Sequence, residues 1–161
     1  MTLEGLVAAV VTVSDGVSAG VREDTSGDVL QELLEGRGVE VQRRLVPDEA
    51  DQISAAIRDA SDDAQLVVTT GGTGFGLRDV TPEATLAVLD REAPGLVHAI
   101  LAAGLEKTPM AALSRARAGS IGDTLVINVP GSPKGASESL EAIIDLLPHA
   151  LQLLSGDNRH H

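Results

Sequence analysis

Apolar residues occur in short runs that are separated by longer segments with helical spacing of apolar and polar positions. Four of the runs are long enough to form strands, at residues 6–13, 39–46, 66–70 and 125–129. Because these runs are continuous rather than alternating, both faces of each strand are expected to be covered, as in a parallel sheet. The pattern predicts an α/β fold with a parallel sheet, right-handed crossovers and helices on both faces.

The segments between the runs predict the covering helices. The first has an apolar stripe at residues 29, 30, 33 and 34, is capped among residues 24–26, and ends at Gly36 and Gly38. The second covers residues 49–60, with Asp48 as a candidate N-cap. Further helices are predicted at 82–90, capped by Thr81, at 94–105, and at 136–147 continuing towards 154, whereas 110–118 favours an extended segment.

Length and composition are those of one globular domain. The chain has 161 residues and a mass of 16.5 kDa, and no linker divides it. We expect a single domain over residues 1–155 and a frayed tail over 156–161. With no Tyr, no Trp and one Phe, the core must be packed from Val, Leu, Ile and Ala.

Charge and cysteine content exclude several classes of function. The formal net charge of -12 and the absence of a basic cluster argue against binding nucleic acid. The chain has no cysteine, so disulfides, thiolate catalysis and cysteine-ligated zinc are excluded. The apolar start is too short to span a membrane and has no basic flank. We therefore expect a cytoplasmic protein that binds neither nucleic acid nor membranes.

A glycine-dense loop after the third predicted strand carries the strongest chemical signal. Residues 69–82 read T-T-G-G-T-G-F-G-L-R-D-V-T-P, with glycines at 71, 72, 74 and 76. Glycine permits positive φ and lets backbone N–H groups approach an oxyanion closely. The loop lacks the Lys-Ser/Thr pair of a P-loop and cannot be read as G-x-G-x-x-G. It indicates an anion cradle of another kind, and the alternative is a tight strand-to-helix turn.

A second loop of the same kind follows the last strand. It reads N-V-P-G-S-P-K-G and contains Pro130, Gly131, Ser132, Pro133 and Lys134. Lys134 is one of only two lysines in the chain, and near a helix N-terminus it is well placed to bind phosphate. The alternative for Lys134 is an ordinary solvated side chain.

Two carboxylates are expected where strands end. Asp48 follows the second strand and Asp79 follows the glycine loop. Together they can share a Mg²⁺ ion, which binds one or two carboxylates plus substrate phosphates. Each also has a purely structural interpretation, as an N-cap for Asp48 and as a turn residue before a helix for Asp79.

The remaining candidates are weaker. Ser114 and Arg115 provide a hydroxyl and a guanidinium suited to a phosphate or a planar heterocycle. His98 and His149 lie in apolar helical stretches, and the chain has neither a G-x-S-x-G nor an H-E-x-x-H motif. Nucleophilic Ser-His catalysis is therefore not expected.

Taken together, the motifs resemble those of the MogA/MoaB family of molybdenum cofactor biosynthesis, which includes the G domain of gephyrin. The resemblance covers nearly the whole chain. Its signatures are V-T-V-S-D at 11–15, V-P-D-E at 46–49, T-T-G-G-T-G and R-D-V-T-P-E-A-T within 69–85, R-E-A-P-G at 91–95, L-S-R at 113–115 and N-V-P-G-S-P-K-G at 128–135.

The resemblance implies a three-layer α/β/α fold with a mostly parallel sheet, and a specific reaction. Family members adenylylate molybdopterin with Mg-ATP, release pyrophosphate and typically form trimers. Their product passes to a molybdenum insertase. Carried onto this chain, Asp48 and Asp79 would be the catalytic and metal-binding acids. Substrate and nucleotide would be bound by Ser14, Asp15, Gly71, Gly72, Thr73, Gly74, Ser114, Arg115, Pro130, Gly131, Ser132, Pro133 and Lys134.

Three alternatives stay open at this point. A MoaB-like paralogue would bind molybdopterin or partner proteins without adenylylating it. A gephyrin-like scaffold would require a second domain. A nucleotide-binding enzyme with an unrelated substrate would have the same loops but would not bind the pterin.

Overall fold

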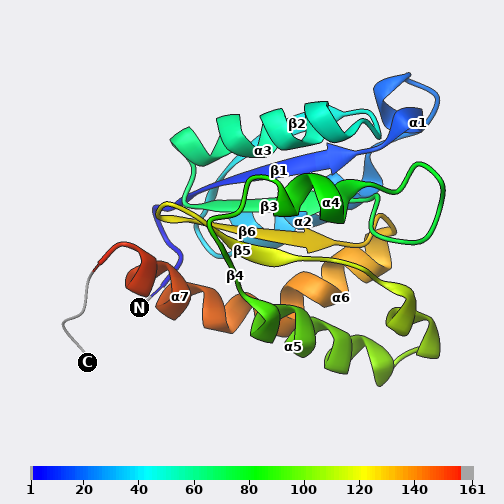
Figure 1. Ribbon diagram of the computed structural model, residues 1–161. Helices are drawn as coiled ribbons and strands as arrows, with labels where there is room; N and C mark the ends of the chain where they lie inside the picture. The colour runs from blue at the N-terminus through cyan, green and yellow to red at the C-terminus, as the bar shows by residue number, and fades with distance from the viewer. Residues whose placement is uncertain (1, 157–161) are drawn as a thin grey trace.

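The computed structural model describes residues 2–156 and contains one six-stranded sheet (Figure 1). The first four strands in spatial order are mutually parallel, and the last two are antiparallel additions at one edge. A mostly parallel sheet was predicted and is confirmed. The spatial order is β2 (Glu40–Val46), β1 (Val7–Val13), β3 (Leu66–Thr70), β6 (Thr124–Val129), β5 (Ala118–Ile121) and β4 (Arg91–Glu92).

Helices cover both faces of this sheet and enclose two apolar cores. On one face Ala8 and Val10 of β1 pack against α2 (Thr25–Glu35), α5 (Pro94–Leu105), α6 (Pro133–Ile143) and α7 (Leu147–Leu154). On the other face Ala9 and Val11 pack against α3 (Ala50–Asp63) and α4 (Thr81–Leu86). In Figure 1, α3 and α4 lie on the opposite side of the strands from α5, α6 and α7. The three-layer α/β/α prediction is confirmed.

The strand register brings the predicted functional loops to one edge of the sheet. Val13 of β1 pairs with Val46 of β2, and Thr70 of β3 pairs with both Thr12 of β1 and Val129 of β6. The loops that follow these strands therefore leave the sheet side by side, beyond the arrowheads in Figure 1. Consecutive crossovers lie on opposite faces, α2 on one and α3 on the other. Such a switch point is where open α/β sheets bind ligands.

The expected extended segment at 110–118 is wrong over its first half. A 3-10 helix forms at Pro109–Leu113, because the Thr108 side chain accepts the Met110 N–H at 3.2 Å and Pro109 has the φ of a helix start. Only from Ala118 is the chain a strand. The short strands β4 and β5 escaped prediction because their sequences carry little apolar signal. The pairing of β4 with β5 is also long-range, whereas β5 pairs with β6 across the turn at residues 122–123.

Two helix ends also differ from expectation. The predicted helix at 82–90 stops at Leu86, and its N-cap is Val80 rather than Thr81, whose hydroxyl is engaged elsewhere. The helix predicted from 136 onward begins at Pro133 and breaks at a 3-10 turn, Ile144–Leu146, before α7. Pro148 has no N–H to continue a helix, and it occupies the first turn of α7 instead.

Most of the predicted tail cannot be compared with the fold. Apart from Gly156, the expected frayed tail lies outside the described residues. Within residues 2–156, no helix is long and apolar enough to cross a membrane.

Candidate active site

A cleft of about 470 Å³ opens at the switch point between β1 and β3. Its floor is formed by the ends of both strands, and its walls come from the glycine loop, the loop after β6 and the segment before α2. The lining residues include Thr12, Ser14, Arg22, Asp24, Ser26, Asp48, Thr70, Gly71, Gly72, Asp79, Gly131, Ser132 and Pro133. Segments more than 100 residues apart in the sequence thus build one polar cleft.

The cleft brings together eight of the residues singled out from the sequence. These are Ser14, Asp48, Gly71, Gly72, Asp79, Gly131, Ser132 and Pro133. Seven others do not line it: Asp15, Thr73, Gly74, Ser114, Arg115, Pro130 and Lys134. Of these, Asp15 bonds to Asp48, and Ser114 and Pro130 line a smaller adjoining pocket of about 240 Å³ that shares Ser132 with the cleft.

The first two glycines of the loop adopt conformations that other residues rarely take. Gly71 has φ of 104° and Gly72 has φ of 70°, while neither Gly74 nor Gly76 has positive φ. Thr81 ties this turn to α4, since its hydroxyl donates to the Gly71 carbonyl at 2.9 Å and its N–H donates to the Gly72 carbonyl at 3.1 Å. That engagement is why Thr81 does not cap the helix.

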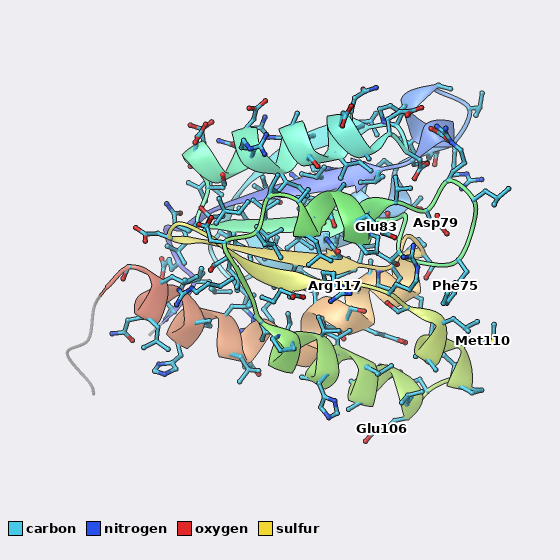
Figure 2. The ribbon with its side chains drawn as sticks, viewed as in Figure 1. Phe75, Asp79, Glu83, Glu106, Met110 and Arg117 are labelled. Atoms are coloured by element: carbon cyan, nitrogen blue, oxygen red, sulfur yellow. The ribbon has the colours of Figure 1, made fainter. Side chains whose placement is uncertain are left out.

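Asp79 closes the loop on itself. Its Oδ2 accepts the N–H of Gly76 at 2.9 Å, and a methyl group built on Gly76 would lie 2.9 Å from the same oxygen. The later glycines are therefore needed for close approach of the Asp79 carboxylate rather than for positive φ. Figure 2 shows Asp79 and Phe75 on the loop that projects beyond the strands, and Glu83 on α4.

Asp48 and Asp15 hold one another through a reciprocal pair of hydrogen bonds. The Asp15 N–H donates to Asp48 Oδ2, and the Asp48 N–H donates to Asp15 Oδ1, each at 2.9 Å. The N-cap alternative for Asp48 is wrong, because Glu49 occupies the cap position of α3 and no side chain caps this helix. The pair joins the end of β1 to the end of β2, and of the two residues only Asp48 lines the cleft.

The two carboxyls have opposite electrostatic surroundings. Partial burial raises the pKa of Asp48 above its ordinary value, and the nearby carboxylates of Asp15 and Asp79 add to the increase. Hydrogen bonds from the Arg78 guanidinium, followed by the Asp48 N–H, lower the pKa of Asp15. Ionised Asp48 is therefore disfavoured by its burial and by its two neighbouring carboxylates, and a perturbed carboxyl in a cleft is a candidate functional residue.

We predict that Asp48→Asn stabilises the fold at pH 7 by a small amount, about 0.5 kcal/mol, given the partial exposure of this carboxyl. A raised folded-state pKa means that ionised Asp48 costs stability; this cost is absent below the unfolded-state pKa and grows as pH rises through the folded-state pKa. Urea unfolding of both proteins should show the difference at pH 7 and none at pH 3. A variant less stable at pH 7 would contradict it.

Arg115 clasps the glycine loop instead of facing the cleft. Its Nε donates to the Gly74 carbonyl at 2.7 Å, its Nη2 to the Asp79 carbonyl at 2.8 Å, and its Nη1 pairs with the Glu83 carboxylate. The guanidinium also lies 5.5 Å from the Phe75 ring centre. Among the described contacts, its donors are directed to the loop and to α4, so the residue supports the cradle from outside.

Arg115→Ala should destabilise the protein by about 2 kcal/mol, since it leaves two loop carbonyls and a carboxylate without their donor. Arg117→Ala is the matched control, because Arg117 forms one exposed ion pair, with Glu92 at 2.9 Å, and should cost less than about 1 kcal/mol. Thermal and urea unfolding of both variants measure the difference. Equal losses would show that the clasp adds nothing.

The loop after β6 packs directly onto the glycine loop. The Thr70 hydroxyl donates to the Pro130 carbonyl at 2.7 Å, and the Gly71 N–H donates to the Val129 carbonyl at 3.2 Å. Ser132 caps α6 by accepting the Gly135 N–H at 3.1 Å. Lys134 lies exposed in the first turn of α6, as predicted, at the border of the site rather than in the cleft.

Sequence reasoning missed the wall formed by residues 22–26. Asp24 was expected only as a helix cap, and it does cap α2. Its Oδ2 also accepts hydrogen bonds from the Thr12 hydroxyl, at 2.7 Å, and from Arg43. The available signal was Thr12, a polar residue inside an apolar run that is 2% exposed in the structure. A buried hydroxyl needs a partner, and the partner is Asp24.

These features define an α/β protein with a polar, carboxylate-bearing cleft at the switch point of its sheet. A family described as "probable molybdopterin binding domain" matches residues 9–149 of the chain. The chain belongs to this family, the MogA/MoaB molybdopterin-binding proteins of molybdenum cofactor biosynthesis.

Named relatives and solved structures agree with this assignment. A molybdopterin adenylyltransferase of Helicobacter pylori is 41% identical over 92% of this chain and 87% of its own. The cinnamon protein of Drosophila melanogaster is 41% identical, but this chain spans 26% of its length. A crystal structure of MoaB from Thermus thermophilus has a TM-score of 0.88 at 50% identity, covering 94% of this chain and 97% of that one.

Proposed function

We propose that this protein transfers an adenylyl group from Mg-ATP to molybdopterin, giving adenylyl-molybdopterin and pyrophosphate. The observation that carries the proposal is the joint placement of Asp48, Asp79 and the positive-φ glycines Gly71 and Gly72 around one cleft. The adenylyltransferase of H. pylori, 41% identical to this chain, supports it.

In the proposed reaction the terminal phosphate of molybdopterin attacks the α-phosphorus of ATP. A new P–O bond forms to that phosphorus, and the bond to the bridging oxygen of the β-phosphate breaks, so pyrophosphate leaves. Such transfers require positioning and charge stabilisation rather than a strong nucleophile. The Gly72 N–H and the hydroxyls of Ser14 and Ser132 would bind and orient the phosphates, while the Gly71 N–H is already bonded to the Val129 carbonyl.

Asp48 and Asp79 would hold the Mg²⁺ ion. Both line the cleft, and a cation there would relieve the burial and the carboxylate repulsion that raise the pKa of Asp48. Within residues 2–156 there is no cluster of three or more His, Cys, Asp or Glu that could hold a metal. Mg²⁺ commonly takes one or two carboxylates and fills its remaining positions with phosphate oxygens and water. When bound, it would neutralise charge on the transferring phosphate.

The adjoining pocket extends this assignment. Its lining includes apolar residues of α5 and the 3-10 helix. Its polar lining residues are Thr108, Ser114, Ser132, Glu138 and Ser139. One of the two hollows would take the nucleotide and the other the pterin, with Ser132 between them. Lys134, at the border, would balance phosphate charge.

The second candidate is a MoaB-like protein that binds molybdopterin or partner proteins without adenylylating it. The observation in its favour is the MoaB structure of T. thermophilus, which at 50% identity is more similar to this chain than the H. pylori enzyme. For either candidate we propose a cytoplasmic homotrimer that passes its ligand to a molybdenum insertase.

The test is to incubate the purified protein with molybdopterin, ATP and Mg²⁺. Formation of pyrophosphate and adenylylated pterin in equal amounts supports the proposal, and removal of Mg²⁺ with a chelator should stop both. Pterin binding without pyrophosphate release would establish the MoaB-like alternative. Light scattering of the same sample tests the trimer.

A further inference from the structure

We propose that Arg78 is a positioning residue that sets the geometry of the two site carboxylates, acting through Asp15. The inference rests on the proposed function and deepens it. Arg78 begins the R-D-V-T-P-E-A-T signature but was not among the predicted site residues, and it does not line the cleft. Its role is therefore indirect.

The Arg78 guanidinium joins the glycine loop to the ends of two strands. Its Nε donates to Asp15 Oδ2 at 3.0 Å, and its Nη2 donates to Asp15 Oδ1 at 3.1 Å. The same Nη2 donates to Glu49 Oε1 at 3.0 Å. Two-point contact with a carboxylate fixes orientation as well as distance, which a lysine ammonium cannot do.

Asp15 transmits this constraint to Asp48. Asp15 Oδ1 accepts hydrogen bonds from both Arg78 Nη2 and the Asp48 N–H. In the other direction, the Asp15 N–H donates to Asp48 Oδ2. A continuous chain of hydrogen bonds thus runs from Arg78 through Asp15 to the Asp48 carboxylate. Because Asp79 is the next residue after Arg78, the same clamp limits how far apart Asp48 and Asp79 can move.

Overall stability gives no sufficient reason for this arrangement. The side chains of Arg78, Asp15 and Glu49 are 56%, 46% and 52% exposed, and ion pairs at such exposure contribute little to folding. An exposed pair can still restrict local geometry, and reactions that depend on positioning lose rate when catalytic groups are displaced slightly. Loss of Arg78 should therefore impair the site while sparing the fold.

The first experiment needs no catalytic activity. Amide hydrogen exchange, followed by NMR, should be about tenfold faster at the Asp15 and Asp48 N–H groups in Arg78→Met than in the natural protein. Arg37→Met is the matched control. Arg37 forms an exposed ion pair with Asp145, with an N–O distance of 3.0 Å, and neither residue lines the cleft. It should leave both amides unchanged. Unchanged exchange in Arg78→Met would overturn the proposal.

The second experiment uses adenylyl transfer. We expect Arg78→Met to lower kcat about tenfold with less than about a twofold change in the KM for Mg-ATP, and Arg78→Lys to recover only part of it. In an Asp15→Asn background the Arg78 substitution should have little further effect. A raised KM with unchanged kcat, or full additivity, would assign Arg78 to direct substrate binding and overturn the positioning role.

The two experiments separate the possible failures. If the natural protein does not transfer adenylate, the proposed function fails, and the exchange rates at Asp15 and Asp48 still decide whether Arg78 positions the site. If transfer occurs and both readouts are insensitive to Arg78, only the positioning role fails.

Discussion

Asp79→Asn is expected to reduce adenylyl transfer at least about 100-fold while leaving the fold intact, as removal of a charge-stabilising group does in other active sites. The asparagine oxygen can still accept the Gly76 N–H, which Asp79 Oδ2 now accepts at 2.9 Å, so the loop keeps its shape. What is lost is the negative charge beside Asp48. Pyrophosphate release under saturating substrates measures the effect, and circular dichroism checks the fold.

Asp90→Asn is the matched control for that variant. The Asp90 carboxylate also accepts one backbone N–H, from Gly122 at 2.7 Å, but Gly122 precedes β6 and lies at the opposite edge of the sheet from the cleft. Its substitution should leave transfer unchanged. An active and folded Asp79→Asn protein would refute the role assigned to Asp79.

Gly71→Ala is expected to destabilise the protein by about 3 kcal/mol or more, from positive-φ strain together with steric overlap. Gly71 has φ of 104°, and a methyl group there would lie 2.3 Å from the Val13 carbonyl oxygen. The obstacle is backbone of a central strand, which cannot move aside as a flexible side chain would. The shifted loop should also lose its anion-binding geometry, so transfer should fall with stability.

Gly20→Ala separates these two costs. Gly20 has φ of 76°, and nothing lies within 4 Å of a methyl group built there. Only the backbone strain applies, and we expect a loss of about 1–2 kcal/mol. Urea unfolding of the two variants should therefore differ by at least about 1 kcal/mol. Equal losses would mean that close packing against Val13 is unimportant.

The elements with strong local signals were predictable. Continuous apolar runs located β1, β2, β3 and β6 to within one residue, and an apolar stripe with caps located α2. The helix predicted at 94–105 is α5. Short elements with little apolar signal were not predictable. β4 is a strand because Arg91 and Glu92 pair with β5, which is distant in the sequence, and two charged residues carry no strand pattern. β5 pairs with β6, the next strand along the chain, but the sequence A-G-S-I carries no pattern that would show this.

The sequence predicted several residues that line the cleft, but it did not predict the hydrogen-bond partners of their side chains. Asp48, Asp79, Gly71 and Ser132 were identified from their positions at strand ends, and all line the cleft. The sequence offered Arg115 as a ligand residue, whereas the structure directs its donors to the loop. A side chain's partners depend on rotamer and on neighbours that are distant in sequence, so residue type alone cannot assign them.

The sequence by itself determined the α/β class, the four parallel strands, the loops at their carboxyl ends and, through its motifs, the family. These follow from local periodicity and from residue types at fixed spacings. The tertiary structure alone decided that Arg78, Asp15 and Asp48 form one hydrogen-bonded chain and that Thr81 ties the glycine turn instead of capping a helix. Those arrangements depend on which strand ends are neighbours, and strand order is a property of the folded sheet.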